Sequence, residues 1–541
     1  MPLTPVNSTD MKKFTKAITF FLAIVAPLLI ITVALRAPKA DHSKLEALRQ
    51  EYPKEHKSGV DHSKMEILQK DFNNPHEMTA ACLTCHTERG TELLHSAHFK
   101  WEREEFIPGR GVTYLGKKNL INNFCTGVQS NEGSCMKCHA GYGWNDKTFD
   151  FTNPFNIDCI VCHDNTGTYK KASGGAGYPE MGPDGPDFKK ILASMGQPKS
   201  ENCGNCHFGG GGGNNVKHGD LEIALLTAGR DVDVHMGVDG AHMNCVDCHT
   251  AENHVMKGRY YGVSSTNTQR LNCEDCHTEF PHQKNILNEH SIKVGCQTCH
   301  IPIYAKVNAT KMYWDWATAT RKKDGKEYEL LDADGNIVYT SIKGDFVWEK
   351  NVKPEYFWFN GTADHHLITD KVDTLNAMLK INTLFGEYRD RNSKIVPMKV
   401  HRGRQPYDTE HLTIIQAKLW DKEKGKGALW LDLDWERSIE EGMAYIPLPY
   451  SGKYAFIQTE MYMPVNHMVS PASQAVTCKE CHTRNDGRLA TLTDFYMPGR
   501  DRNRFIDLAG QLTLLLSFIG IFAHASIRYM AARKRKTAQI Q

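Results

Sequence analysis

The sequence lacks a strong net charge. Its 65 lysines and arginines nearly balance 63 aspartates and glutamates, which gives a formal charge of +2. Nucleic-acid-binding domains usually carry a marked basic excess, so the charge balance argues against a nucleic-acid partner. The chain is also poor in hydrophobic residues, which make up 40% of its 541 residues. Something other than side chains is therefore expected to contribute to the apolar core.

Almost no cysteine is left over from one repeated motif. The pattern C-x-x-C-H occurs eight times and uses all of the 17 cysteines except Cys125. The motifs are CLTCH (82–86), CMKCH (135–139), CIVCH (159–163), CGNCH (203–207), CVDCH (245–249), CEDCH (273–277), CQTCH (296–300) and CKECH (478–482). With one cysteine outside them, an intrachain disulfide is excluded.

The histidine in each motif distinguishes haem attachment from zinc binding. Histidine makes up 26 of 541 residues, so its place after the second cysteine in all eight motifs is not chance. A structural zinc site takes its second pair of ligands from a distant segment. C-x-x-C-H is instead the attachment signature of c-type haem, in which the thiols bond the porphyrin and the histidine binds iron. We expect eight covalently bound haem c groups, which also supply apolar core.

The expected cofactor-binding residues are the cysteines and histidines of these motifs. They are Cys82, Cys85, His86, Cys135, Cys138, His139, Cys159, Cys162, His163, Cys203, Cys206, His207, Cys245, Cys248, His249, Cys273, Cys276, His277, Cys296, Cys299, His300, Cys478, Cys481 and His482. Each motif histidine is the expected proximal iron ligand. Calcium is a further candidate cofactor, to which the sequence assigns no ligands.

Two uncharged segments flank the motifs. Residues 17–35 are closed by Arg36 and form a run of nineteen, longer than a signal-peptide core of about 7–15 residues. No A-x-A site follows, which favours an uncleaved membrane anchor over a cleaved signal. Residues 508–527 are followed by a basic tail. The positive-inside rule places both termini in the cytoplasm. Because haem c is attached outside the cytoplasm, the sequence predicts a bacterial inner-membrane protein whose main domain is periplasmic.

Motif spacing divides the chain into five parts. A signal-anchor or transmembrane helix (1–36) precedes a spacer (37–75) that contains the repeat DHSKLEALRQEY (41–52) and DHSKMEILQKDF (61–72). Apolar residues at helical spacing predict a helical spacer, with His42 and His62 facing solvent. Residues 76–300 carry seven motifs, the active haem among them, and residues 301–500 form a domain with the eighth. Residues 501–541 are the second transmembrane helix and its cytoplasmic tail.

The expected fold is a mainly α multihaem c-type cytochrome with long loops, stacked haems and transmembrane helices at both ends. Seven motifs within residues 82–300 leave room for few other elements, so the haems are expected to lie nearly in contact. Residues 322–348 alternate polar and apolar side chains around the turn signals KDGK and ADGN. This pattern predicts a β-hairpin within a mixed α/β insertion of the C-terminal domain.

A glycine-rich stretch, FGGGGGNNVKHGD (208–220), carries a second unusual feature. Its glycines suit a backbone pressed against a flat ring or an anion, although a flexible surface loop is the common alternative. Lys217 and His218 follow, and either side chain is able to reach an iron. Lysine binds iron only when neutral, and its deprotonation at pH 7 costs about 4.6 kcal/mol. Burial must offset this cost, and a weakly held amine suits a site that opens to substrate.

Together these motifs resemble the octahaem tetrathionate reductase family. The likeness covers about residues 76–500. It rests on the eight motifs, a lone cysteine ten residues before the second of them, and the stretches GGNNVKHGDL, LNEHSIKVGCQTCHIP (287–302) and MPVNHMVSP (463–471). Members of that family are periplasmic and reduce tetrathionate, and also nitrite and hydroxylamine. Familiar members are soluble, whereas this chain is expected to be anchored at both ends.

The resemblance implies roles for individual residues. The active haem is expected on Cys135 and Cys138, with His139 as proximal ligand, Lys217 as distal ligand and Cys125 lining the pocket. The catalytic residues are therefore Lys217, Cys125 and His139, and the sulfur of Cys125 either reacts or only shapes the pocket. The other haems are implied to be bis-histidine. Local context selects their distal ligands among His95, His98, His218, His242, His254, His290, His401 and His467.

The expected activity is that of a haem-dependent oxidoreductase. It would reduce tetrathionate to thiosulfate, and also nitrite or hydroxylamine to ammonia, with electrons from a quinol or a membrane b-type cytochrome. Two alternatives remain. One is an electron-transfer conduit with a strong ligand on every iron, and the other is a hydroxylamine oxidoreductase-type enzyme. The sequence does not fix the oligomeric state.

Overall fold

The computed structural model describes residues 20–21, 25, 28–29, 43–51, 60–183, 185–258, 268–376 and 378–538. They belong to two compact units, residues 1–475 and residues 476–541, and each is described by itself. Apart from five positions, the predicted N-terminal anchor (17–35) lies outside the described residues, as does His42. The described part of the spacer contains helical turns: α3 (Ser43–Glu51), η2 (His62–Lys64) and α4 (Glu66–Gln69).

Most motifs lie on one short helical turn. Since residues i and i+3 share a helix face, a single turn brings both thiols of C-x-x-C to one side. The motif elements are α5 (Pro75–Leu83), α8 (Glu132–Cys135), η3 (Met136–Cys138), α9 (Ile160–His163), α11 (Ser200–His207), α12 (Cys245–Cys248), η7 (Cys273–Asp275), α14 (Cys296–His300) and α17 (Cys478–Cys481). In α12, η7 and α17 an acidic residue between the cysteines closes a capping box, so the motif itself starts the turn.

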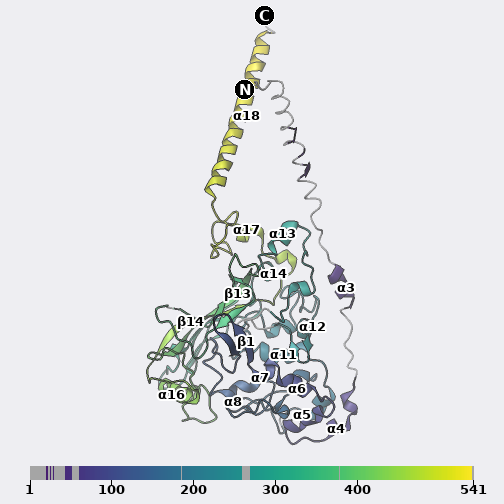
Figure 1. Ribbon diagram of the computed structural model, residues 1–541, viewed down its shortest axis with the longest axis vertical. Helices are drawn as coiled ribbons and strands as arrows, with labels where there is room; N and C mark the ends of the chain where they lie inside the picture. The colour runs from purple at the N-terminus through teal and green to yellow at the C-terminus, as the bar shows by residue number, and fades with distance from the viewer. Residues whose placement is uncertain are drawn as a thin grey trace, which may run out of the picture. The chain divides into compact units, whose positions relative to one another are not determined.

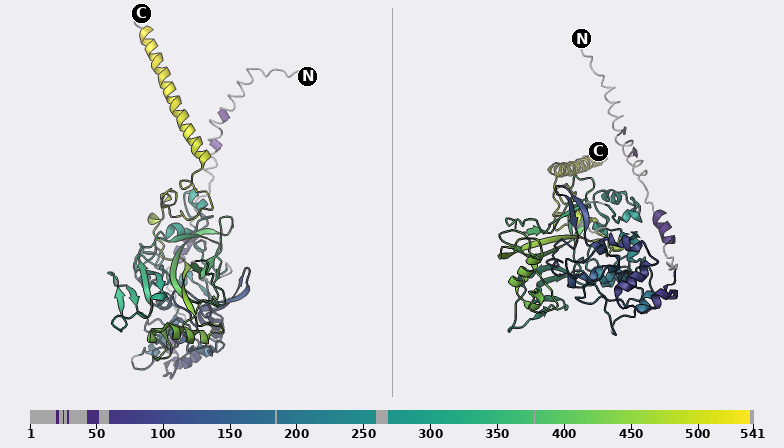
Figure 2. Two further views of the ribbon diagram at one scale, coloured as in Figure 1. Left: turned by 90° about the vertical axis from the view of Figure 1, so that its left-hand side faces the viewer. Right: turned by 60° about the horizontal axis from the view of Figure 1, so that its bottom comes forward.

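Short helices also occur between the motifs, among longer stretches of turn and loop. They are α6 (Arg89–Leu94), α7 (Ala97–Lys100), η4 (Pro154–Asn156), α10 (Phe188–Ala193), η5 (Ile223–Leu226), α13 (Asn285–His290), η8 (Trp316–Thr318), α15 (Leu429–Asp432), α16 (Trp435–Tyr445) and η9 (Ala472–Gln474). Figures 1 and 2 show the helices of the first motifs on one side of the unit that ends at residue 475, with the main sheet and α16 on the other.

The fold is mixed α/β rather than mainly α, so that prediction was wrong. An eight-stranded sheet has the order β11-β14-β13-β5-β8-β7-β6, with β9 paired to β13. Its strands are β5 (Thr310–Asp315), β6 (Glu329–Leu331), β7 (Ile337–Thr340), β8 (Gly344–Glu349), β9 (Glu355–Phe359), β11 (Met378–Lys380), β13 (Lys394–Asp408) and β14 (Tyr454–Pro464). The long central strand β13 is buried on both faces over much of its length, so its sequence lacks the alternation that identifies a half-exposed strand.

The predicted hairpin is confirmed as part of this sheet. Strands β6 and β7 pair antiparallel around the ADGN turn, and β7 pairs with β8. Three two-stranded pairs complete the strands: β1 (Arg103–Ile107) with β2 (Gly111–Leu115), β3 (Ala251–Glu252) with β4 (Val255–Met256), and β10 (Ala363–His365) with β12 (Asn382–Leu384). Against the main sheet packs an aromatic core that includes Trp314, Trp316 and Trp435, with Cys125 at its border.

The unit formed by residues 476–541 contains α17 and the helix α18 (Arg504–Ala538). Within the described residues, α18 contains the one segment that is long and apolar enough to cross a membrane, from Arg504 to Arg533. The predicted span, residues 508–527, lies inside it. Its large apolar side chains are exposed, for example Phe505 and Phe522.

Candidate active site

Five motif histidines face a second histidine ring at a nearly constant distance. The ring centres are 6.0–6.3 Å apart in the pairs His86–His62, His207–His98, His277–His235, His249–His467 and His300–His282. Two imidazoles on opposite sides of one metal have centres about 6.3 Å apart, since each metal–nitrogen bond is about 2.0–2.1 Å and each ring adds about 1.1 Å. The paired rings therefore fit a haem iron between them.

The second ring nitrogen of several motif histidines is held by a fixed partner. Nδ1 of His163 lies 2.7 Å from the carbonyl of Gly196, and Nδ1 of His249 lies 2.9 Å from that of Lys257. A metal-bound histidine commonly donates its other ring N–H to a carbonyl or carboxylate, which fixes its tautomer and orientation. These contacts direct Nε2 away from the backbone and are a second point of fit to haem ligation.

The structure distributes the eight distal candidates unevenly. His98 and His467 face the motif histidines His207 and His249, and His254 interacts with His163. His218 is near His207. His95 and His242 are exposed, His290 bonds the carbonyl of Ile286, and His401 is buried against Phe124.

Three facing histidines were missed by the sequence reasoning: His62, His235 and His282. His62 faces His86, so the prediction that it faces solvent was wrong. The polar repeat that contains His62 did not indicate that this side chain turns away from solvent. Asp61 accepts the Ser63 amide and so starts the helical turn that carries His62. His235 and His282 lie in segments without any periodic pattern, so only three-dimensional proximity identifies them.

The histidine of the second motif has different surroundings. Among the eight motif histidines, all within the described residues, His139 alone is fully buried. Its ring lies among five aromatic rings, those of Phe99, Trp101, Trp144, Phe149 and Phe151. Nε2 lies 2.6 Å from the carbonyl oxygen of Phe99. Burial lowers the pKa of His139 to about 3, so the ring is neutral at pH 7.

Lys217 reaches the same motif from the glycine-rich loop. The loop turns at Gly211 and Gly212, whose φ angles of +83° and +97° favour glycine. Burial lowers the pKa of Lys217 to about 7, and the charge of Lys117 lowers it further. The side chain also interacts with Cys138, a thiol of the second motif. The lowered pKa makes the neutral form of the Lys217 amine far more accessible than in an exposed lysine.

Cys125 lies beside the other thiol of this motif. The Cys125 thiol is within hydrogen-bonding reach of Cys135, which lowers the pKa of Cys125, and the cation of Lys343 lowers it further. The structure thus brings Cys125, Lys217 and the second motif together. Buried His365 joins them: its pKa is lowered to about 4, first by burial and also by the charge of Lys217. No sequence pattern singled out Lys117, Lys343 or His365.

Thiols of different motifs also lie within hydrogen-bonding reach of one another. The pairs are Cys82 with Cys159, Cys138 with Cys206, Cys203 with Cys245, and Cys273 with Cys296. Each pair joins two attachment sites, so neighbouring haems are expected to be close at these points. Among the described residues, no group of three or more His, Cys, Asp or Glu side chains is placed to hold a metal ion, and no residues are assigned to calcium.

Comparisons with known proteins agree with this arrangement. Residues 311–485 match the family described as "Cytochrome c bacterial". An uncharacterized protein of Archaeoglobus fulgidus is 24% identical over 255 residues, which cover 38% of this chain and 83% of that protein. The crystal structure of octaheme cytochrome c from Shewanella oneidensis superposes with a TM-score of 0.75 at 41% identity. The match covers 82% of this chain and 98% of that one.

Proposed function

Because this chain belongs to the octahaem cytochrome c family, we propose that it is a reductase whose active centre is the haem of the second motif. Eight haems are attached through the eight motifs, and seven of them carry electrons. The observation that carries the proposal is that the second motif differs from the other motifs in the surroundings of its histidine. His139 bonds Phe99 through Nε2, while the half-buried Lys217 lies near Cys138 with a lowered pKa.

In this proposal Lys217, not His139, is the protein ligand of the active haem. The carbonyl of Phe99 only accepts, so Nε2 of His139 carries the proton and has no lone pair for iron. Lys217 binds as the neutral amine, which burial favours. The haem, when bound by these residues, would supply electrons one at a time and an iron to which a small ligand could bind. The sequence expectation of His139 as proximal ligand is not carried into the proposal.

The proposed substrate is tetrathionate, in keeping with the family resemblance. Lys117 and Lys343 place positive charge near the site, which attracts a dianion. Cys125 acts as a thiolate that attacks the central S–S bond, which forms a mixed disulfide and releases one thiosulfate. Two electrons then cleave that disulfide, which releases the second thiosulfate and restores the thiolate. No proton is consumed in this sequence.

Nitrite and hydroxylamine are the second proposed substrates, and their reduction requires protons. His365 supports this use because it is buried and interacts with Lys217. Its Nδ1 lies 3.0 Å from the carbonyl of His366, which leaves Nε2 to accept or donate. In this proposal His365 and Lys217 transfer protons to the substrate in the pocket.

The proposed location is the bacterial inner membrane. Covalent haem places the motif-bearing chain outside the cytoplasm, and α18 is long and apolar enough to anchor it. The basic residues at the C-terminal end of α18 then lie in the cytoplasm, as do the lysines that precede the N-terminal apolar run. A quinol or a membrane b-type cytochrome is the proposed electron donor.

Electron paramagnetic resonance of the oxidised holoprotein tests the proposal. Lys217→Ala should change the signal of one haem and abolish viologen-linked reduction of tetrathionate, nitrite and hydroxylamine. Lys170→Ala removes an exposed lysine and is the matched control. If all eight haems give bis-histidine signals that Lys217→Ala leaves unchanged, the protein is an electron conduit. If Lys217→Ala changes the signal and activity persists, the active centre lies elsewhere.

A further inference from the structure

Glu132 is a buried carboxyl group one helical turn from the second haem attachment. Its side chain belongs to α8 and lies three residues before Cys135, on the same helix face. The residue is 4% exposed. The hydroxyl of Tyr445 donates to Oε1 at 2.9 Å, and that hydroxyl accepts the amide of Lys147 at 2.7 Å. The negative charge of Glu132 is felt at Cys135, whose pKa it helps to raise.

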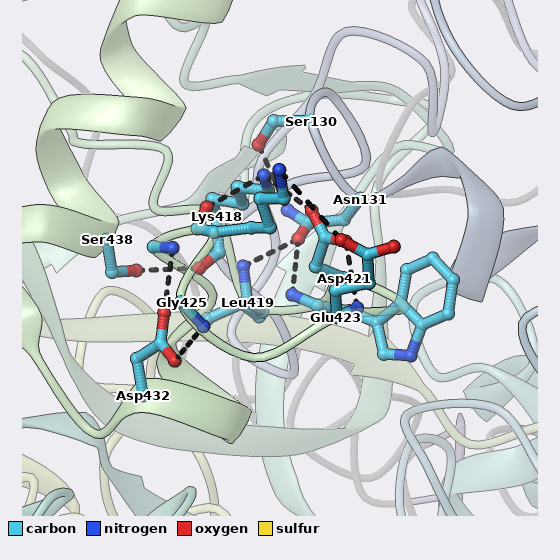
Figure 3. A network of polar contacts seen from close by, with 12 residues as sticks. Ser130, Asn131, Lys418, Leu419, Asp421, Glu423, Gly425, Asp432 and Ser438 are labelled. Carbon is cyan, nitrogen blue, oxygen red and sulfur yellow. Dashed lines mark hydrogen bonds and ion pairs between the residues drawn. The ribbon is translucent and has the colours of Figure 1, made fainter.

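A cleft of about 280 Å³ connects Glu132 to the surface. Its lining residues are Ser130, Glu132, Gly133, Asn145, Lys418, Trp420, Asp421, Lys422, Glu441 and Tyr445. The cleft is fixed on the side of α8, because Oδ1 of Asn131 accepts the amides of Leu419 and Trp420 at 2.6 and 3.2 Å (Figure 3). The cleft therefore gives solvent access to the carboxyl group of Glu132, which protein atoms otherwise enclose.

Both positively and negatively charged groups surround Glu132, so no single cation holds its side chain in the ionised form. The titratable and charged groups that face it are Tyr445 and Glu441 from α16, Asp146 and Lys147 from the loop after the second motif, Lys418, Asp421 and Lys422 across the cleft, and Cys135 on α8. Lys418 pairs with Asp421 at 2.7 Å, which neutralises one of these cations. Burial raises the pKa of Glu132 to about 7, and Tyr445 partly opposes this rise.

We propose that Glu132 is a proton-binding site that takes up a proton from the cleft when the second haem is reduced. An arriving electron removes one positive charge beside the carboxylate, so a proton from water binds Glu132 and keeps the local charge constant. On reoxidation the proton returns to the cleft. The electron comes through the neighbouring haems from the external donor, and no bond of the substrate changes in this step. The inference rests on the proposed role of the second motif as the active centre.

The potential of the second haem, measured on the holoprotein, tests this coupling. Its signal is identified as the one that Lys217→Ala changes, and its midpoint is followed between about pH 5.5 and pH 8.5. In the wild type the potential should fall as the pH rises through 7, by up to tenfold in electron affinity per pH unit. Glu132→Gln should lower this slope to the part contributed by other groups such as Lys217, and should hold the potential nearer the acidic value of the wild type. A wild-type slope in Glu132→Gln would overturn the proposal.

Two further variants separate proton binding from a structural effect. Glu441→Gln removes a carboxylate from the same cleft and should keep the wild-type slope. Tyr445→Phe removes the bond that favours the carboxylate, so the falling region should move to higher pH. If Glu132→Gln does not retain its haems, this displacement decides the question, and an unchanged profile in Tyr445→Phe counts against the proposal.

Redox-difference infrared spectra give a readout that does not depend on Lys217. At pH 7 the wild type should gain the band of a protonated carboxyl group on reduction with dithionite, and Glu132→Gln should lack this band. If Lys217→Ala changes no haem signal, the proposed active centre fails while the band still reports on Glu132. If the band is absent from the wild type, the proton-binding role fails while the active centre stands.

Discussion

The Nε2 atom of His139 lies 2.6 Å from the carbonyl oxygen of Phe99, whereas His163 uses Nδ1 for its carbonyl partner. The two motifs therefore hold their histidines through opposite ring nitrogens. Because a carbonyl only accepts hydrogen bonds, the bonded nitrogen carries the proton in each ring. Nε2 is free to bind a metal in His163 and is protonated in His139. The same C-x-x-C-H sequence thus gives two chemically different sites.

Replacement of His62 is expected to change one haem. His62 and His86 face each other with ring centres 6.3 Å apart, so His62→Ala removes a ring from the expected first haem. Optical and electron paramagnetic resonance spectra should show one haem converted from low spin to high spin. The matched control is His42→Ala, which changes the corresponding histidine of the sequence repeat and should leave the spectra unchanged. Equal spectra for His62→Ala and the wild type would contradict the pairing.

Alkylation of the holoprotein is expected to label Cys125 alone, because the other sixteen cysteines lie in the motifs proposed to bind haem. A hydrogen bond from Cys135, backbone hydrogen bonds at Gly127 and Thr126, and the cation of Lys343 lower the pKa of Cys125. Only the contribution of Cys135 is lost once that residue is a thioether. Since the thiolate reacts, the alkylation rate should rise with pH through this pKa. Lys343→Gln should move the rise to higher pH. A pH profile unaffected by Lys343→Gln would rule out this electrostatic role.

Loss of Lys171 is expected to destabilise the fold more than loss of a surface lysine. Lys171 pairs with Asp158 at 3.0 Å, and both side chains are at most 2% exposed. Lys171→Met would leave a buried carboxylate unpaired, at a cost of about 3–5 kcal/mol in unfolding free energy. Lys190→Met breaks the exposed pair with Asp187 and should cost about 0–1 kcal/mol. Denaturant unfolding measures both, and adding Asp158→Asn to Lys171→Met should recover part of the loss.

Stability should fall on the acid side partly because of His365. Burial lowers the pKa of His365 to about 4, below the value of about 6.5 for an exposed histidine. The unfolded chain therefore binds this proton first, and the contribution to stability is complete above about pH 6.5 and is lost as the pH falls through 4. His365→Gln should reduce the pH dependence of the free energy of unfolding in this window. His242→Gln, at an exposed position, should leave it unchanged. Parallel curves for His365→Gln and the wild type would refute this assignment.

The sequence specified candidate attachment sites residue by residue, whereas it predicted the surrounding fold only in part. C-x-x-C-H is a local motif, so its residues follow from the sequence alone, and Cys125 stood out because it was left over. Lys217 was suggested by glycines that give its loop freedom to turn. Strand β13 could not be read, because burial on both faces removes the alternation that marks a strand.

Contacts between distant segments explain most of what was missed. His235 lies 42 residues before His277, and nothing between them indicates that the chain folds back. The aromatic rings around His139 come from residues 99–101 and 144–151, in which no periodic pattern occurs. The pairing of Glu132 with Tyr445, separated by 313 positions, is likewise a property of the fold alone.

The thiol pairs imply that the order of the motifs along the chain differs from the order in which their haem sites contact one another. Cys82 meets Cys159, so the first site adjoins the third, while Cys138 meets Cys206 and Cys203 meets Cys245. The fourth site is therefore a junction with one contact to the second and another to the fifth. Electron transfer through such a junction depends on a site that lies away from the active centre. Loss of the fourth haem would therefore remove one route by which electrons reach the second, although every residue of the pocket remained in place.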